Sequence, residues 1–346
     1  MPESPPIIAL TTGDPAGVGP EIVTKAIADG RWLGRLRPVV VGDASVIRGV
    51  VEACGLDLQV RVVTDPADVL AEAGTLDVLD CDAVGDFTYG KVDAACGRAA
   101  ITYIEKACEL ARDGSVHGLV TGPINKEAIW AAGSKFPGHT EMLAHLFDVP
   151  EEEAVTMFLL GKMRIFFLTR HLSLVDAIAK LEVGMVERFL HRAHTAIADV
   201  GVSNPTLALS ALNPHGGENG KMGAEEQQIL APAVERAQAA GLDVVGPVPA
   251  DAVFHQARQG RYDGVIALFH DQGHIASKTV DFFGTVACEL GLPVIRTTVD
   301  HGTAFDIAGT WVADAGGQSE AMLAAAEFAP GVLRVRREKA EGRGRG

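Results

Sequence analysis

The stretch VIALFHDQGHIASK, from Val265 to Lys278, decides the fold prediction because an apolar run ends abruptly in polar residues. Val265 to Phe269 has the length and composition of a buried strand, and His270 and Asp271 follow it directly. Open α/β sheets bind their ligands beyond the carboxyl ends of their strands. This stretch therefore predicts an α/β sheet with a functional site at the end of this strand.

The same arrangement occurs twice earlier in the chain. The apolar run Ile165 to Thr169 precedes His171, and the run Leu207 to Leu212 precedes His215. Imidazole is the commonest side-chain metal ligand, and three protein ligands that leave positions open are typical of a catalytic centre. The three runs therefore predict one metal centre, whose ligands are His171, His215 and His270.

Segments typical of strands and helices alternate along the chain. This alternation predicts βαβ units and a mostly parallel sheet with some antiparallel strands, which is the α/β fold class. Ala154 to Leu160 and Met163 to Leu168 predict an antiparallel hairpin, and Arg334 to Gly346 predicts a solvated, disordered end. Further strands are predicted at Pro6–Leu10, Pro38–Val41, Gln59–Val63 and Gly118–Thr121, and helices at Ala44–Cys54 and Val92–Arg112.

The composition excludes several classes of protein. A length of 346 residues exceeds the usual size of one domain and predicts two. A hydrophobic fraction of 47% with 39 glycines fits an α/β enzyme rather than a disordered or fibrous chain. A formal charge of −15 excludes nucleic acid and anionic membranes as main partners, so an anionic substrate requires a local basic pocket.

Cysteines and apolar runs predict the compartment. The five cysteines form no C-x-x-C pair and are odd in number, which is typical of free thiols in a reducing compartment. The N-terminus has no charged region followed by a long apolar run, and no run approaches the ~18 residues of a membrane span. We therefore expect a soluble, cytoplasmic protein without a membrane partner.

Basic and polar residues predict an anion site. His139 and Thr140 lie at a predicted helix start, where free amides and the helix dipole attract phosphate, and Thr140 can cap the helix. The alternative is a cap with an incidental histidine. Lys278 and Arg296 add cations, since arginine binds a carboxylate or phosphate at two points. Lys126 is either a further phosphate or carboxylate contact or a solvated lysine at a helix start.

Thr11 to Pro20, TTGDPAGVGP, is a glycine-rich stretch between a predicted strand and a predicted helix. Its three glycines invite comparison with a phosphate cradle, but they fit neither the G-x-G-x-x-G pattern nor the P-loop. We therefore favour a tight turn.

Together these stretches resemble one family. From about Ile7 to Phe328 the chain is similar to the 4-hydroxythreonine-4-phosphate dehydrogenase family of vitamin B6 biosynthesis. Each motif alone is weak, and their combination is highly specific. The matching motifs are TTGDPAGVGPE at Thr11 to Glu21, TGPINK at Thr121 to Lys126, PGHTE at Pro137 to Glu141, LNPHGGE at Leu212 to Glu218, HDQG at His270 to Gly273 and GLPVIRTTVDHGTA at Gly291 to Ala304.

The resemblance implies roles for the predicted site residues. His171, His215 and His270 would bind one divalent cation, such as zinc, magnesium, cobalt or manganese. The active site would be shared within a homodimer, with one histidine supplied by the second copy. The phosphorylated substrate would be bound by the residues of the predicted anion site, His139, Thr140, Lys278 and Arg296.

The family is similar to isocitrate and isopropylmalate dehydrogenases, which implies two α/β domains in three layers with the active site in the cleft. Residues 1–135 and 283–346 would form the domain with the cofactor loop, and residues 136–282 the domain with the metal ligands and dimer contacts. The cofactor loop of that wider group is similar to the stretch from His301 to Gly309. NAD is therefore expected to contact His301, Gly302, Thr303, Ala304 and Asp306.

The implied reaction is oxidation of the 3-hydroxyl of 4-hydroxythreonine 4-phosphate, or of a similar 4-phosphorylated four-carbon hydroxy acid, followed by decarboxylation. A divalent cation would lower the pKa of the hydroxyl and stabilise the enolate as carbon dioxide leaves, and NAD would accept the hydride. The candidates for proton removal, directly or through a water held by lysine, are Asp271, Lys126 and Lys278.

The chain departs from the family pattern at several positions. Ala287 stands where the family has a substrate-binding asparagine, His274 and Ser277 replace apolar residues, and Arg170 replaces a frequent threonine. Changed hydrogen-bond partners in a dry site can reject a substrate. The sequence HDQGH resembles that of paralogues that oxidise D-threonate or D-erythronate 4-phosphate. Two alternatives from other classes are a metal-dependent lyase or hydrolase and a non-catalytic binding protein.

Overall fold

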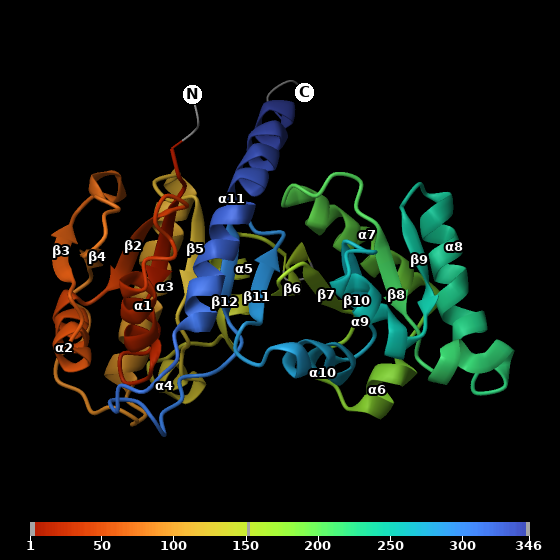
Figure 1. Cartoon of the computed structure of the whole chain (residues 1–346), viewed down its shortest axis with the longest axis horizontal. Helices are drawn as coiled ribbons and strands as arrows, with labels where there is room; N and C mark the ends of the chain where they lie inside the picture. The colour runs from red at the N-terminus through yellow and green to blue at the C-terminus, as the bar shows by residue number, and fades with distance from the viewer. Residues whose placement is uncertain (1–3, 151–152, 344–346) are drawn as a thin grey trace. The chain divides into compact units, whose positions relative to one another are not determined.

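The computed structural model describes residues 4–150 and 153–343, and the chain folds into two compact units (Figure 1). Unit 1 consists of Met1–Ala154 and Leu292–Gly346, and unit 2 consists of Val155–Gly291. The sequence predicted divisions after residues 135 and 282. The structure divides the chain later at both points, after Ala154 and after Gly291. The first division lies later because Met142 and Leu143 are buried in the core of unit 1.

Unit 1 contains a sheet in which every strand pair is parallel. The strand order is β3-β4-β2-β1-β5-β12. Ile8, Ala9 and Leu10 of the central strand β1 are fully buried, as expected for a parallel strand covered on both faces. The strands are β1 (Ile7–Thr11), β2 (Arg37–Gly42), β3 (Gln59–Val63), β4 (Thr75–Asp80), β5 (Gly118–Thr121) and β12 (Ile295–Val299).

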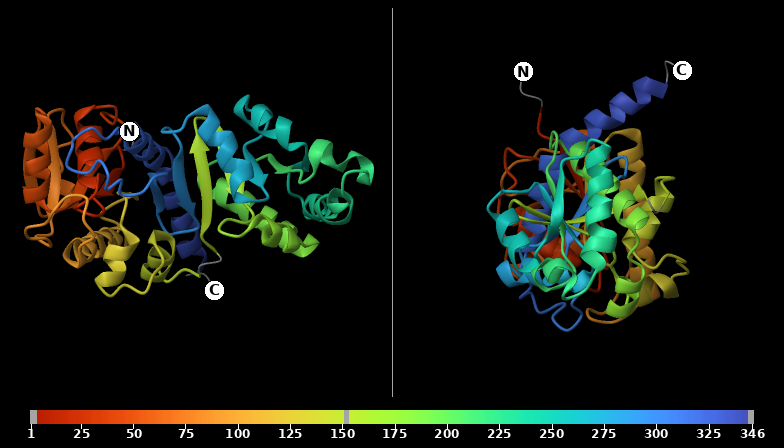
Figure 2. Two further views of the ribbon diagram at one scale, coloured as in Figure 1. Left: turned by 90° about the horizontal axis from the view of Figure 1, so that it is seen from below. Right: turned by 90° about the vertical axis from the view of Figure 1, so that its right-hand side faces the viewer.

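Two groups of helices cover the faces of this sheet (Figure 2). Helix α1 packs against α2 and α11, and α3 packs against α4 and α5. The helices are α1 (Gly19–Ala28), α2 (Ala44–Cys54), α3 (Ala94–Asp113), α4 (Lys126–Ala131), α5 (His139–Leu146) and α11 (Gly316–Arg343), with a short 3-10 turn at Pro66–Asp68. The predicted order of strands and helices is therefore confirmed in this unit.

The C-terminal segment differs from its prediction. The basic residues from Arg334 were predicted to be disordered, yet α11 continues to Arg343. The Arg336 guanidinium donates to the carbonyl oxygens of Ala111 and Arg112 at the end of α3, at 3.1 and 2.9 Å. The prediction was wrong because these helix-terminal carbonyls, which lack partners within α3, attract an arginine side chain. Residues 344–346 lie outside the described part of the chain.

Unit 2 contains a mixed sheet with the strand order β11-β6-β7-β10-β8-β9. The pairs β11/β6 and β6/β7 are antiparallel, so the predicted hairpin is confirmed, and the pairs β7/β10, β10/β8 and β8/β9 are parallel. The predicted α/β class with a mostly parallel sheet is therefore confirmed. The strands are β6 (Val155–Leu160), β7 (Met163–Phe167), β8 (Leu207–Ser210), β9 (Val244–Val248), β10 (Gly264–Ala267) and β11 (Val286–Leu290).

The helices of unit 2 also form two groups. Helix α7 packs against α8, whereas α9 and α10 pack against the parallel strands β7 and β10. The helices are α6 (Leu174–Ala179), α7 (Val183–Asp199), α8 (Ala231–Ala239), α9 (Ala250–Arg258) and α10 (His270–Val280), with a 3-10 segment η3 (Pro214–Gly220) and a π-helical turn η4 (Glu226–Leu230). Within residues 4–150 and 153–343, none of the helices has the length and apolarity that a membrane crossing requires.

Candidate functional site

The three predicted metal ligands follow three neighbouring parallel strands of unit 2. His171 lies four residues after β7, His270 begins α10 after β10, and His215 lies in η3 after β8. Because β7, β10 and β8 are adjacent and parallel, their carboxyl ends lie at one edge of the sheet. The fold thus brings the three histidines to the same edge.

Only two of these imidazoles are close neighbours. The ring centroids of His171 and His270 are 6.2 Å apart. The His270 ring also stacks on His274, with centroids 4.0 Å apart, and His274 stacks on Phe167. Within the described part of the chain, no group of three or more His, Cys, Asp or Glu residues could hold a metal ion. One chain therefore pairs His171 with His270 and does not add His215.

Carboxylates contact the Nδ1 atoms of two of the predicted ligands. The His270 Nδ1 atom lies 2.7 Å from Asp271, and the His215 Nδ1 atom lies 3.1 Å from Glu218. Metal-binding histidines usually donate their second ring nitrogen to a carboxylate, which fixes the tautomer and turns the other nitrogen toward the ion. The donor set therefore fits a divalent cation bound through Nε2 atoms. Glu218 was not singled out by the sequence reasoning, although it ends the motif LNPHGGE.

The loop that carries His215 has an unusual backbone. His215 has φ 53° and ψ 25°, and Gly216 to Asn219 continue in the left-handed region. A non-glycine residue in such a conformation costs about 1–3 kcal/mol, which surrounding contacts must offset. A strained histidine at a strand end is typical of a functional position.

Glu226 supplies contacts that hold this loop. The Glu226 carboxylate is 4% exposed and accepts from the backbone amides of Leu212 and Asn213 at 2.9 and 2.7 Å, and from the Asn213 side chain at 2.8 Å. Burial acts to raise the pKa of Glu226, but these hydrogen bonds outweigh it and lower the pKa below its usual value. The loop is thus bound to an ionised carboxylate at the start of η4.

Two residues of the HDQG motif position the strand ends. Gln272 accepts from the Leu268 amide at 2.7 Å and donates to the Ala211 carbonyl at 2.8 Å, so it connects the ends of β10 and β8. A Cβ on Gly273 would lie 2.5 Å from the Phe167 ring, so only glycine allows α10 to pack this closely on β7. The sequence reasoning missed both roles, although the motif itself marked them.

A basic cluster lies in unit 1. Arg296 on β12 is 5% exposed and donates through Nε and a terminal nitrogen to the Thr121 hydroxyl on β5, at 3.0 and 2.8 Å. Burial and the positive charge of Arg296 hold the pKa of His139 well below its usual value. His139 is therefore neutral near pH 7, and its buried Nε2 has no hydrogen-bond partner among the described residues. An arginine beside an imidazole without a partner is a site that can bind an anion.

The other predicted anion-site residues have different positions. Gly138 is the N-cap residue of α5 and has no side chain, so the prediction that Thr140 is the cap was wrong. The cap lies earlier because His139 already has helical geometry. Lys126 is exposed at the start of α4, and its Cε atom lies 3.9 Å from the position of a Cβ on Gly138. Lys278 is in unit 2, where its Nζ atom lies 4.8 Å from the centre of the Phe282 ring.

The predicted cofactor loop, from His301 to Gly309, lies between β12 and α11 without regular secondary structure. Thr303 is buried against the glycine-rich turn, and its carbonyl accepts from the Val18 amide at 3.0 Å. The glycine-rich stretch thus packs against the predicted cofactor loop. His301, Gly302 and Asp306 are exposed. An exposed carboxylate on an anchored loop is suited to accept hydrogen bonds from a ribose, so the loop fits a dinucleotide.

Comparison with known proteins assigns the family. The model of the family described as pyridoxal phosphate biosynthetic protein PdxA matches residues 35–325. The chain belongs to the PdxA family. This PdxA-family protein is a dehydrogenase, and its membership implies an NAD-type cofactor. The predicted family and enzyme class are therefore confirmed.

The PdxA-family dehydrogenase has close relatives of known name. A Cutibacterium acnes protein, named as a candidate D-threonate 4-phosphate dehydrogenase, is 46% identical over 351 residues, which cover 100% of both chains. A Halalkalibacterium halodurans protein with the same name is 46% identical over 94% of this chain and 97% of that one. The crystal structure of a Burkholderia phymatum 4-hydroxythreonine-4-phosphate dehydrogenase is 42% identical, with a TM-score of 0.83 over 93% of this chain and 98% of that one.

Proposed function

We propose that the protein is an NAD-dependent and divalent-metal-dependent dehydrogenase that oxidises the 3-hydroxyl of D-threonate 4-phosphate, with subsequent loss of carbon dioxide. The sequence predicted 4-hydroxythreonine 4-phosphate as the main substrate, with D-threonate or D-erythronate 4-phosphate as the alternative. The observation that carries the present proposal is the 46% identity over the full chain to a protein named for D-threonate 4-phosphate. The 4-hydroxythreonine-4-phosphate enzyme of solved structure is 42% identical.

The surroundings of Ala287 support a changed substrate. Ala287 on β11 is 9% exposed and lies opposite Phe158 on β6, within an apolar cluster of unit 2. The His274 ring lies 4.5 Å from the Phe158 ring, centroid to centroid. The amide that binds substrate elsewhere in the family is therefore absent, and an imidazole is present near His270. We propose that this exchange favours a 2-hydroxy acid over a 2-amino acid.

The proposed cation is held by His171 and His270 of one chain and by His215 of a second copy. The 6.2 Å separation of the first two rings and the carboxylate contact at His215 Nδ1 support this proposal. A bound divalent cation would lower the pKa of the substrate hydroxyl and stabilise negative charge on the oxidised product. We propose that Asp271 orients His270 rather than removing the substrate proton, because its Oδ1 already contacts Nδ1. Lys126 and Lys278 then remain as candidates for proton removal.

The proposed homodimer agrees with the apolar surface of unit 2. Val175 on α6 is 76% exposed, and Phe282 and Phe283, which follow α10, are 60% and 62% exposed. Such exposed apolar side chains mark interaction surfaces. They lie close in sequence to His171 and His270, so a second copy that covers them would approach the proposed metal site.

The substrate phosphate is proposed to bind to Arg296, His139 and Thr140, with Lys278 as a further cation. Arg296 is fixed by Thr121 and supplies charge. Neutral His139 supplies a hydrogen bond through the Nε2 atom that has no partner among the described residues. NAD is proposed to contact His301, Gly302, Thr303, Ala304 and Asp306.

NADH absorbance measured with three substrates and a divalent cation tests this function. We expect the highest kcat/KM with D-threonate 4-phosphate, a lower value with D-erythronate 4-phosphate and the lowest with 4-hydroxythreonine 4-phosphate. A preference for 4-hydroxythreonine 4-phosphate would contradict this proposal and support the main prediction from the sequence. Conversion of the acid phosphates without NAD would instead support the lyase or hydrolase alternative.

A further inference from the structure

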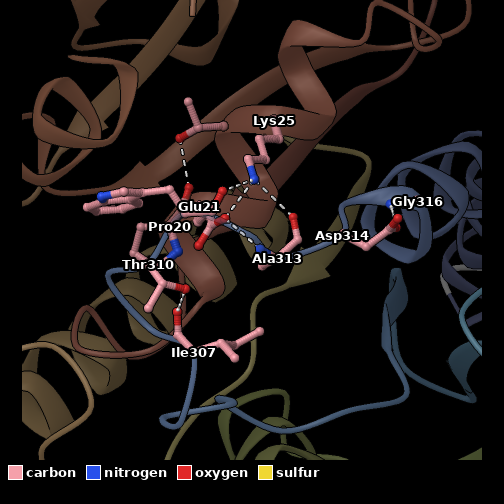
Figure 3. A network of polar contacts seen from close by, with 10 residues as sticks. Pro20, Glu21, Lys25, Ile307, Thr310, Ala313, Asp314 and Gly316 are labelled. Atoms are coloured by element: carbon pink, nitrogen blue, oxygen red, sulfur yellow. Dashed lines mark hydrogen bonds and ion pairs between the residues drawn. The ribbon is translucent and has the colours of Figure 1, made fainter. Parts of the chain in front are cut away.

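A partly buried ion pair on α1 binds the segment that follows the proposed cofactor loop (Figure 3). The Lys25 Nζ atom donates to Glu21 at 2.7 Å and to the carbonyls of Trp311 and Ala313 at 2.9 and 3.0 Å. The same Glu21 oxygen accepts from the Ala313 amide at 2.8 Å. All three donors of the ammonium group are therefore used.

The segment that these residues bind does not hold its own backbone in place through regular secondary structure. Residues 311–315 belong to no helix or strand, and Trp311 has φ +64°, which is costly for a bulky residue. Within the segment, the Thr310 hydroxyl contacts the Ile307 carbonyl at 2.6 Å and the Gly316 amide contacts Asp314 at 2.7 Å (Figure 3). These short-range contacts do not attach it to the sheet or to α1.

The turn before α1 and its first residues hold both ends of the loop. The Val18 amide donates to the Thr303 carbonyl near the beginning, and Glu21 with Lys25 binds Trp311 and Ala313 at the end. Between these two points lies most of the proposed dinucleotide loop, including Ala304 and Asp306. A displacement of Ala313 would therefore change the path of the backbone that carries Asp306.

We infer that Glu21 and Lys25 are positioning residues for the dinucleotide, because they hold the loop from Thr303 to Ala313 in one conformation before NAD binds. This inference rests on the proposed function for the identity of the loop. Glu21 is 2% exposed and the Lys25 side chain 23%, so the pair lies largely away from solvent and is not a surface contact of little consequence. Preorganisation of a binding loop raises affinity because less ordering is required on binding.

The inference is tested with Lys25→Met, which keeps most of the side-chain length and removes every donor. The matched control is Lys106→Met on α3, because the hydrogen bond of Lys106 within the described part of the chain is to Glu109, at 2.9 Å, in an exposed pair. Glu21→Gln is the second variant, since an amide oxygen can still accept from Ala313. For each protein, calorimetry measures the Kd of NAD. Hydrogen exchange without NAD measures how fast the amides of residues 301–313 exchange, which reports how often this segment opens.

We expect Lys25→Met to weaken NAD binding about tenfold, the effect of losing hydrogen bonds to a charged group, and to accelerate amide exchange in residues 301–313. Glu21→Gln should also weaken NAD binding and accelerate this exchange, but by less. Lys106→Met should change neither the NAD affinity nor the exchange rate. The KM of the phosphorylated substrate should stay within about twofold in all variants.

An NAD Kd that stays at the wild-type value while exchange accelerates would overturn the inference, because the pair would then be structural only. Equal losses for NAD and for the phosphorylated substrate would also overturn it. Wild-type protein that binds NAD but turns over no sugar-acid phosphate would contradict the proposed function and leave this inference standing. Wild-type protein that binds no NAD would contradict both.

Discussion

The Nδ1 atom of His270 lies 2.7 Å from Oδ1 of Asp271, the residue that follows it at the start of α10. Asp271 is 73% exposed, so its position beside the imidazole does not result from burial. A carboxylate in this position favours the tautomer that carries its proton on Nδ1, and it makes Nε2 a stronger ligand. The contact thus orients the His270 ring at the strand end, as a metal ligand requires.

Asp271→Asn should weaken divalent metal binding by roughly 10–100-fold, because the carboxylate contact to His270 is lost. Metal titration by calorimetry measures this, and saturating metal should recover most of the turnover. Asp251→Asn, which removes an exposed carboxylate from the first turn of α9, serves as control and should bind metal normally. Normal metal affinity with complete loss of turnover would show instead that Asp271 removes the substrate proton.

Co-expression of His171→Ala with His215→Ala should restore activity that neither variant has alone. If His215 is supplied by the second copy, each mixed dimer contains one intact site, and random pairing gives about one quarter of wild-type activity. Co-expression of His171→Ala with His270→Ala should restore none, because both residues come from one chain. Failure of the first pair to restore turnover or bound metal would contradict the shared site.

Thr121→Val should raise the KM of the phosphorylated substrate about tenfold with little change in kcat. The Thr121 hydroxyl accepts two hydrogen bonds from Arg296, and without it the guanidinium is held less firmly in its orientation. Thr298→Val is the matched control, since the Thr298 hydroxyl on the neighbouring strand contacts only the Thr121 carbonyl among the contacts described, at 2.8 Å. If both variants raise KM equally, the Thr121 hydroxyl has no specific role in orienting Arg296 for the phosphate.

Asp14→Asn should stabilise the protein at neutral pH. Asp14 is fully buried, Oδ1 accepts from the Ala16 amide at 2.9 Å, and Oδ2 has no hydrogen-bond partner among the described residues. Burial raises the pKa of Asp14 from 3.8 to about 6, with Asp93 contributing and the Ala16 amide opposing. Between these values the native state retains a proton that the unfolded chain has released, so stability falls as pH rises through this window.

The expected gain for Asp14→Asn is about 2 kcal/mol in the free energy of unfolding at pH 8, and close to zero at pH 4. Urea unfolding at the two pH values measures it. Asp113→Asn is the control, and it should lower the free energy of unfolding at pH 8 rather than raise it, because hydrogen bonds to Ser115 lower the pKa of Asp113. A variant less stable than wild type at pH 8 would show that the Asp14 carboxylate is stabilised by contacts that the amide cannot replace.

The sequence by itself determined the fold class, the order of elements and the residues that end the strands. Apolar runs with the period of a strand or a helix report burial directly, so β7, β8 and β10 and the histidines that follow them were predictable. The same reasoning placed His139 and Arg296 in an anion site, because helix starts and arginines have chemical preferences that a sequence displays. It failed for Arg334 to Arg343, where local charge predicted disorder and α11 continues.

Only the tertiary structure decided which of these residues lie together. The 6.2 Å separation of His171 and His270, the contact of Glu226 with the Asn213 loop and the attachment of Ala313 to Glu21 and Lys25 join residues distant in the chain. A contact of this kind depends on strand order and helix packing, which periodicity does not encode. The sequence thus determines which chemical groups are present, whereas the fold decides which of them become neighbours and in what orientation.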